Sequence, residues 1–179
     1  MSLTDNLLDP VEEPYRRQMT SYRRSRSAIL GATKNLIALH GLQATTMIEI
    51  ADTAEVSRAT LYNHFRSKES VMQAVLEFEI SRILECAGSE SSPAGALARI
   101  SIEISTDPAL ATMRSTDPAL LTQLLSAGTD PLWQQVHAAL VEMLQSTGKV
   151  ELALRWLIGQ VFAPLTPEQS ARAADAITA

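Results

Sequence analysis

The run from Thr46 to Lys68 constrains the fold most, because helix-start signals divide it into two short helices and the beginning of a third. The Thr46 hydroxyl can accept a hydrogen bond from a free backbone N–H, and Glu49 three residues later completes a capping box. Ser57 and Ser67 stand at equivalent positions before the next two apolar segments. Two short helices joined by a tight turn form a helix-turn-helix, whose second helix commonly enters the major groove of DNA.

The second helix of this motif has an apolar face and a polar face. Leu61 and Phe65 lie one turn apart, so we expect both in the core. Polar side chains on the other face suit base edges. Tyr62 and Lys68 suit phosphates, and Lys68 stands at an exposed helix start. The alternatives are that Tyr62 only packs across the head and that Lys68 only faces water. DNA contacts are predicted for Thr46, Ser57, Arg58, Ala59, Thr60, Tyr62, Asn63, His64 and Lys68.

Several short patterns occur together at the spacing of one family. They are Gly-Leu at 41–42, Ala-Thr-Thr at 44–46, Ile-Ala at 50–51, Val-Ser at 56–57 and LYNHF-x-SKE at 61–69. With these patterns, residues 25–77 resemble the N-terminal domain of the TetR family of transcriptional regulators. One departure is Glu55, where the family usually has glycine; if this turn position needs a positive φ, Glu55 adds a little strain.

We divide the chain into three parts. Residues 1–24 are predicted to be a flexible arm, whose arginines either follow a DNA minor groove or form a solvated basic tail. Residues 25–70 are predicted to be the helix-turn-helix domain, with a first helix from Ser25 to His40 that ends at a left-handed Gly41. Residues 71–179 are predicted to be a helical body, to which the resemblance assigns effector binding and dimerisation.

The composition favours an all-α fold, since hydrophobic residues make up 46 % of the chain and aromatic residues only 4 %. The net charge of −5 taken alone argues against a nucleic-acid partner. However, residues 15–68 contain nine Lys and Arg and only three acidic residues. A basic head on an acidic body is the charge distribution expected of local DNA binding.

Three Asp-Pro steps predict helix starts in the body, because aspartate caps a helix and proline fits its first position. They occur in STDPAL at 105–110 and 115–120 and in GTDPL at 128–132. Two long helices are predicted over 131–146 and 149–163, separated by Thr147 and Gly148. The second has an apolar stripe of Val150, Leu154, Leu157 and Val161.

In TetR-like proteins two such helices from each subunit pair as a four-helix bundle, so the resemblance implies a homodimer. Two recognition helices about 34 Å apart would then read a palindrome. The resemblance also implies a small-molecule effector bound within the body. Ordinary core packing is the alternative role for each effector-site candidate. These candidates are Met72, Phe78, Met113, Trp133, His137 and Trp156.

Nothing in the chain has the spacing of a metal site, a phosphate loop or a nucleophile elbow, so we predict no metal, no cofactor and no enzyme activity. With no signal-peptide pattern and no long apolar stretch, we expect a cytoplasmic protein. Our hypothesis is a homodimeric repressor that a small-molecule effector releases from a palindromic operator. The alternatives are an activator of the same family and a helical interaction protein that does not bind DNA.

Overall fold

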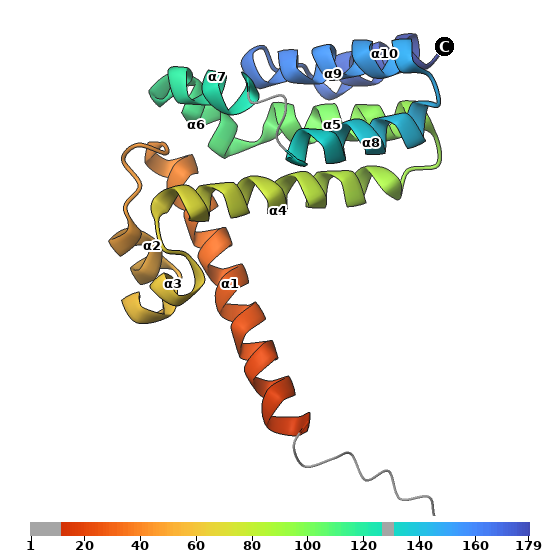
Figure 1. The fold of residues 1–179 in the computed structure, drawn as a ribbon. Helices are drawn as coiled ribbons and strands as arrows, with labels where there is room; N and C mark the ends of the chain where they lie inside the picture. Colours follow the sequence, from red (N-terminus) through yellow and green to blue (C-terminus); the bar gives the residue numbers. More distant parts are fainter. Residues whose placement is uncertain (1–11, 127–130) are drawn as a thin grey trace, which may run out of the picture.

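A computed structural model describes residues 12–126 and 131–179, which form helices and connecting turns without a strand (Figure 1). The head lies at one end of the long helix α4, and the body helices pack over the rest of α4. This arrangement confirms the predicted all-α fold. The helices are α1 (Glu12–His40), α2 (Met47–Thr53), α3 (Arg58–His64), α4 (Lys68–Gly88), α5 (Pro93–Thr106), α6 (Pro108–Thr116), α7 (Pro118–Ser126), α8 (Pro131–Leu144), α9 (Thr147–Phe162) and α10 (Pro167–Thr178).

The helix boundaries of the motif follow the predicted capping residues. Thr46 and Glu49 form a capping box at the start of α2, and the Ser57 hydroxyl accepts from the backbone N–H of Thr60 at the start of α3. The turn between these helices places Glu55 at φ 53°, the left-handed region that favours glycine. The condition named for strain at Glu55 is therefore met, which explains why glycine is usual at this position.

The predicted end of the first helix is also confirmed, because α1 stops at His40 and Gly41 has φ 89°. A side chain at Gly41 would collide with Thr116 and Asp117 of the body. Glycine is therefore required here by backbone conformation and by close packing together.

The predicted start of the first helix is wrong. The helix begins at Glu12 rather than at Ser25, so residues 12–24 are helical and not an irregular arm. Two acidic residues followed by Pro14 are themselves a helix-start signal, because proline is tolerated in the first turn and acids complement the helix dipole. Residues 1–11 lie outside the described part of the chain.

The Asp-Pro steps mark helix starts, but their aspartates differ in role. Asp107 caps α6 by accepting from the N–H groups of Ala109 and Leu110, as predicted. Asp117 precedes α7 and accepts from Leu42 and Gln43 of the head. The aspartate of the third step lies in 127–130, outside the described residues, although α8 does begin at Pro131.

Two features of the C-terminal half differ from the prediction. The break between α8 and α9 falls at Gln145 and Ser146, because Gln145 adopts the left-handed φ of 50°; Thr147 and Gly148 already belong to α9. A further helix, α10, was not predicted. It begins with a Thr166 capping box and packs against α5.

The head and the body meet where α1 and the turn after it contact α6, and we call this contact the seam. Thr112 of α6 donates its hydroxyl to the carbonyl of Ala38 at 2.7 Å. Asp117 accepts from Leu42 at 2.8 Å and from Gln43 at 3.3 Å. The seam is thus closed by polar contacts between residues far apart in sequence.

None of the described helices is long and apolar enough to cross a bilayer.

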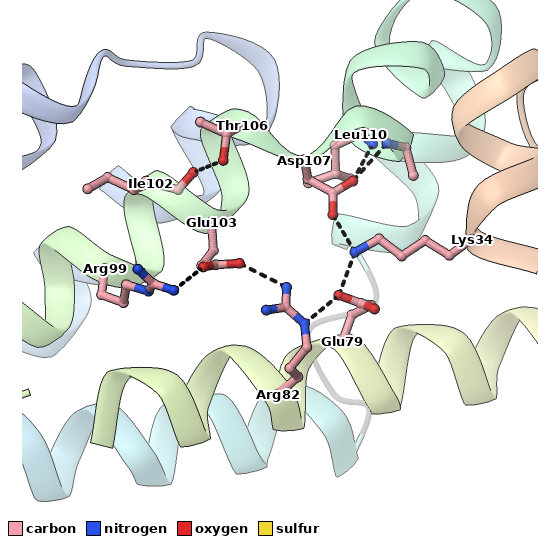
Figure 2. Close-up of polar contacts among 10 residues, drawn as sticks. Lys34, Glu79, Arg82, Arg99, Ile102, Glu103, Thr106, Asp107 and Leu110 are labelled. Carbon is pink, nitrogen blue, oxygen red and sulfur yellow. Dashed lines mark hydrogen bonds and ion pairs between the residues drawn. The ribbon is translucent and has the colours of Figure 1, made fainter. Parts of the chain in front are cut away.

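An ion-pair network adds charged links between α1, α4, α5 and α6 (Figure 2). Lys34 of α1 binds Glu79 of α4 at 2.6 Å and the α6 cap Asp107 at 2.8 Å. Arg82 of α4 binds Glu79 at 3.0 Å and Glu103 of α5 at 2.9 Å. Burial alone would lower the pKa of Lys34, but the hydrogen bonds that its ammonium donates to Asp107 and Glu79 raise it above its ordinary value. Lys34 therefore stays charged, which keeps α1 tied to the body.

Candidate nucleic-acid interface

Helix α3 presents a polar face to solvent because its apolar face is fixed in the head core. Leu61 is fully buried, while Tyr62 is 51 % exposed and Arg58 and Asn63 are also exposed. The opposite sides of this two-turn helix are therefore a packed apolar face and an exposed polar face, as the sequence predicted. The exposed side carries a guanidinium, a phenol and an amide, which match the donors and acceptors of base edges and phosphates.

The start of α3 is held by a local pair of hydroxyls. Ser57 Oγ accepts from the Thr60 backbone N–H at 3.0 Å and lies 2.8 Å from Thr60 Oγ1. Both side chains lie at the surface, so they can hold the helix end while remaining accessible to DNA. Ala59 beside them is exposed and leaves room for close approach of a partner.

Thr46 performs its capping role and shares its hydroxyl with Glu49. The hydroxyl accepts from Glu49 N at 3.2 Å and donates to Glu49 Oε2 at 2.9 Å. The hydrogen bonds from the Thr46 side chain and backbone lower the pKa of Glu49, which keeps its carboxylate charged. An acid at this edge would repel a phosphate placed beside it. DNA contact by Thr46 remains a prediction.

The structure gives Lys68 a different environment from the one predicted. The residue is half-buried, and its ammonium donates to the carbonyls of Leu42, Gln43 and Thr45 at 3.0, 3.1 and 2.9 Å. An ammonium has three N–H donors, and these carbonyls use all three. Lys68 therefore fastens the start of α4 to the turn between α1 and α2. Phosphate contact by Lys68 remains a prediction.

His64 also points back into the head. Its Nε2 lies 2.7 Å from Ser25 Oγ, and its ring packs on Tyr22 with the centroids 4.2 Å apart. Ser25 Oγ donates to carbonyls of its own helix, so the economical tautomer has Nε2–H donating to Ser25 and an unprotonated Nδ1. Burial first, and then the positive charge of Arg26, lowers the pKa of His64. A neutral His64 thus braces α3 against α1.

The sequence analysis missed Tyr22, Ser25 and Arg26 as supports of the interface. Arg26 places its guanidinium carbon 5.8 Å from the centroid of the Phe65 ring, within cation–π range. The signal was present, because residues 22, 25, 26 and 29 share one face of a helix. Tyr22 was overlooked because the helix was expected to begin only at Ser25.

The structure does not gather the six predicted effector-site residues around one cavity. Met72 and Met113 pack in the cluster between α1, α6 and α7, whereas Trp156 packs in the cluster of α5, α8, α9 and α10. Phe78 is 44 % exposed, His137 is exposed and Trp133 is half-buried. A surface pocket of about 220 Å³ between α4 and α8 is lined by other residues. These are Gln73, Glu77, Pro131, Leu132 and Gln135.

A basic head with an exposed recognition-type helix, joined by one long helix to a larger helical body, is the architecture of helix-turn-helix transcriptional regulators. Residues 29–75 match the family described as "Bacterial regulatory proteins, tetR family". The N-terminal domain of the chain therefore matches that of TetR-family transcriptional regulators, which confirms the predicted resemblance.

Two curated proteins are similar to a part of the chain. The chain is 43 % identical over 51 residues to the HTH-type transcriptional repressor KstR2 of Rhodococcus jostii (strain RHA1), which is 28 % of this chain and 25 % of that protein. It is 39 % identical over 57 residues to the HTH-type transcriptional regulator QacR of Staphylococcus aureus (strain Mu50 / ATCC 700699), which is 32 % of this chain and 30 % of that protein. The chain thus aligns with less than a third of the length of either relative.

Solved structures resemble the chain over most of its length. One of them is the TetR family repressor AlkX from Dietzia sp. strain DQ12-45-1b, implicated in biodegradation of n-alkanes, with a TM-score of 0.59 at 23 % identity. The alignment covers 86 % of this chain and 92 % of the AlkX chain. Another is a TetR transcriptional regulator from Rhodococcus sp. RHA1, with a TM-score of 0.54 at 22 % identity. The alignment covers 87 % of this chain and 96 % of the chain of that regulator. At these identities the likeness shows that head and body share the fold.

Proposed function

We propose that the protein is a homodimeric repressor that binds a palindromic operator through α3 and is released by a small-molecule effector. The observation that carries this proposal is the exposed face of α3, with Arg58, Tyr62 and Asn63 directed outward and Leu61 fully buried on the opposite side. A small rigid helix with that division of faces fits the major groove.

Selection of duplexes from a random 30-base-pair library by the purified protein tests DNA binding directly. Asn63→Ala is expected to cost about 1–3 kcal/mol on the selected duplex and little on mixed-sequence DNA, because an amide that reads a base edge carries specificity. Asn35→Ala is the matched control, since Asn35 is an exposed asparagine on α1 of the same head. Failure to select any sequence would favour the alternative, a helical interaction protein without DNA binding.

Dimerisation through α8 and α9 is proposed with a different set of contacts from the one the sequence suggested. The stripe of Val150, Leu157 and Val161 is buried inside the chain and is not available to a partner. Large apolar side chains that do face outward on these helices are Val141, Leu152 and Phe162. Leu152 is 54 % exposed, so Leu152→Glu is expected to shift sedimentation from dimer toward monomer with the helix content retained. A dimer that persists unchanged would place the interface elsewhere.

Repression and release are proposed by analogy and by mechanism. KstR2 and AlkX are named repressors, and we propose that this protein also represses transcription. An activator would differ only in where its operator lies. Release requires that the effector prefer a body conformation that separates the two heads. The network of Lys34, Glu79 and Asp107 supports this proposal, because a shift of α6 relative to α4 pulls on α1 (Figure 2). Calorimetric titration of the selected duplex with and without a candidate effector measures the coupling.

A further inference from the structure

The N-terminal part of α1 extends beyond the head and contacts it at Tyr22, which packs on His64. We call residues 12–24 the overhang. Every side chain described from 18 to 24 is exposed, and the first buried residue of α1 is Ile29. Figure 1 shows the overhang running away from the body, past α3. At 1.5 Å per residue its 13 residues span roughly 20 Å, well over the width of the DNA major groove of about 12 Å.

The overhang begins with two glutamates, Glu12 and Glu13, and is basic after them. Residues 16–26 contain five arginines and no acidic residue. Arg23 and Arg24 are exposed and form no ion pair within the described part of the chain. A short helix without tertiary packing is marginally stable in water, and a dense run of one charge adds repulsion. A polyanion along this helix would relieve the repulsion and supply the missing contacts.

The root of the overhang is fixed to the recognition helix. His64, the last residue of α3, packs on the Tyr22 ring and lies within hydrogen-bond distance of Ser25. Arg26 adds a contact with the Phe65 ring. The overhang therefore leaves the head from the C-terminal end of α3. DNA that receives α3 in its major groove must then lie close to these arginines.

We propose that the overhang is a second DNA-contacting element, in which Arg23 and Arg24 bind phosphates that flank the groove entered by α3. This inference rests on the proposed DNA binding and extends it to a longer operator. The partner is identified by charge, since the overhang offers guanidinium groups that pair well with phosphate oxygens. These contacts add affinity without reading sequence.

The test compares the parent with the double variant Arg23→Gln, Arg24→Gln on a duplex selected by the parent from a random 30-base-pair library. Glutamine has nearly the helix propensity of arginine, so the overhang should remain helical, which circular dichroism checks. Loss of two phosphate contacts should reduce the slope of log affinity against log salt by about two. Affinity at 0.1 M salt should fall roughly ten- to hundredfold, equally on selected and mixed DNA. Hydroxyl-radical protection should shrink at the flanks.

A charge-matched control carries Arg155→Gln and Arg172→Gln, two exposed arginines on α9 and α10 of the body. An unchanged slope and footprint for Arg23→Gln, Arg24→Gln, with the parent still selecting a duplex, would refute the overhang contact and leave the proposed function intact. Loss of binding to vesicles of phosphatidylglycerol, with DNA binding unchanged, would refute it in favour of a membrane-surface helix. A parent that selects no duplex would overturn the proposed function and this inference together.

Discussion

Replacing Asp117 by alanine is expected to weaken the seam between the head and the body. Asp117 is only 3 % exposed, and its carboxylate accepts from the backbone N–H of Leu42 at 2.8 Å and of Gln43 at 3.3 Å. These amides belong to the turn that follows α1. An acidic side chain of the body thus completes the hydrogen bonding of a turn in the head, and alanine would leave both donors without an acceptor.

The magnitude follows from the two hydrogen bonds. A hydrogen bond to a charged group contributes about 1.5–3 kcal/mol, and the short, buried bond from Leu42 belongs in this range. The longer, partly exposed bond from Gln43 adds about 1 kcal/mol or less. Loss of the hydrogen bond from Thr116 to Asp117 costs little, because the Thr116 hydroxyl can still donate to the carbonyl of Thr112 at 3.0 Å. The free energy of unfolding of Asp117→Ala should therefore fall by about 3 kcal/mol.

Urea unfolding followed by circular dichroism measures this loss. Both proteins must be studied at the same concentration, because the stability of an oligomer depends on it. A fall of about 3 kcal/mol corresponds to a shift of the midpoint by roughly 1 M urea. Asp175→Ala serves as the control, since Asp175 is an exposed aspartate of α10, and it should stay within about 0.5 kcal/mol. A loss below about 1 kcal/mol for Asp117→Ala would mean that water replaces the carboxylate, and the seam argument would be refuted.

Two further predictions concern the supports of the interface. Lys68→Met should lower the free energy of unfolding by about 2 kcal/mol, because three carbonyls lose their donor. If Lys68 only bonds these carbonyls, the variant should keep the salt slope of DNA binding, whereas a slope reduced by about one would confirm the predicted phosphate contact. The pKa of His64 is lowered in the folded state, so as the pH falls below the ordinary value of 6.5 this histidine binds a proton in the unfolded state first. The free energy of unfolding therefore falls from pH 7 toward pH 5. His64→Asn should make that decline shallower in urea titrations at each pH, whereas parallel curves for parent and variant would contradict it.

The parts of the fold that were predicted correctly depend on contacts within three residues along the chain. The hydroxyl of Ser57 reaches the N–H of Thr60, and Ser67 reaches Ser70 in the same way. Such caps are visible in sequence, because donor and acceptor are held together by the helix itself. The same local logic fixed the left-handed Gly41. The exposed face of α3 follows from the helical repeat for an equally local reason.

The parts that were not predicted depend on contacts between distant residues. Lys68 bonds carbonyls 23 to 26 positions away, and His64 reaches Ser25 across 39 positions. A lysine at a helix start has the same sequence pattern whether it faces water, phosphate or carbonyls. Asp107 and Asp117 make this plain, since both precede proline in the same hexapeptide, yet one caps its own helix and the other bonds the head. Their tertiary surroundings decide between these roles.

Three of the polar links from the head to the body converge on α6 and its ends. Thr112 bonds Ala38, Asp117 bonds Leu42, and Asp107 at the start of α6 binds Lys34. All three partners lie on α1 or in the turn directly after it, so a displacement of α6 acts on one helix. Because α1 also carries the overhang and the contact with His64, its rotation would move the overhang and α3 together. The seam would therefore be one mechanical route by which the proposed effector is coupled to DNA.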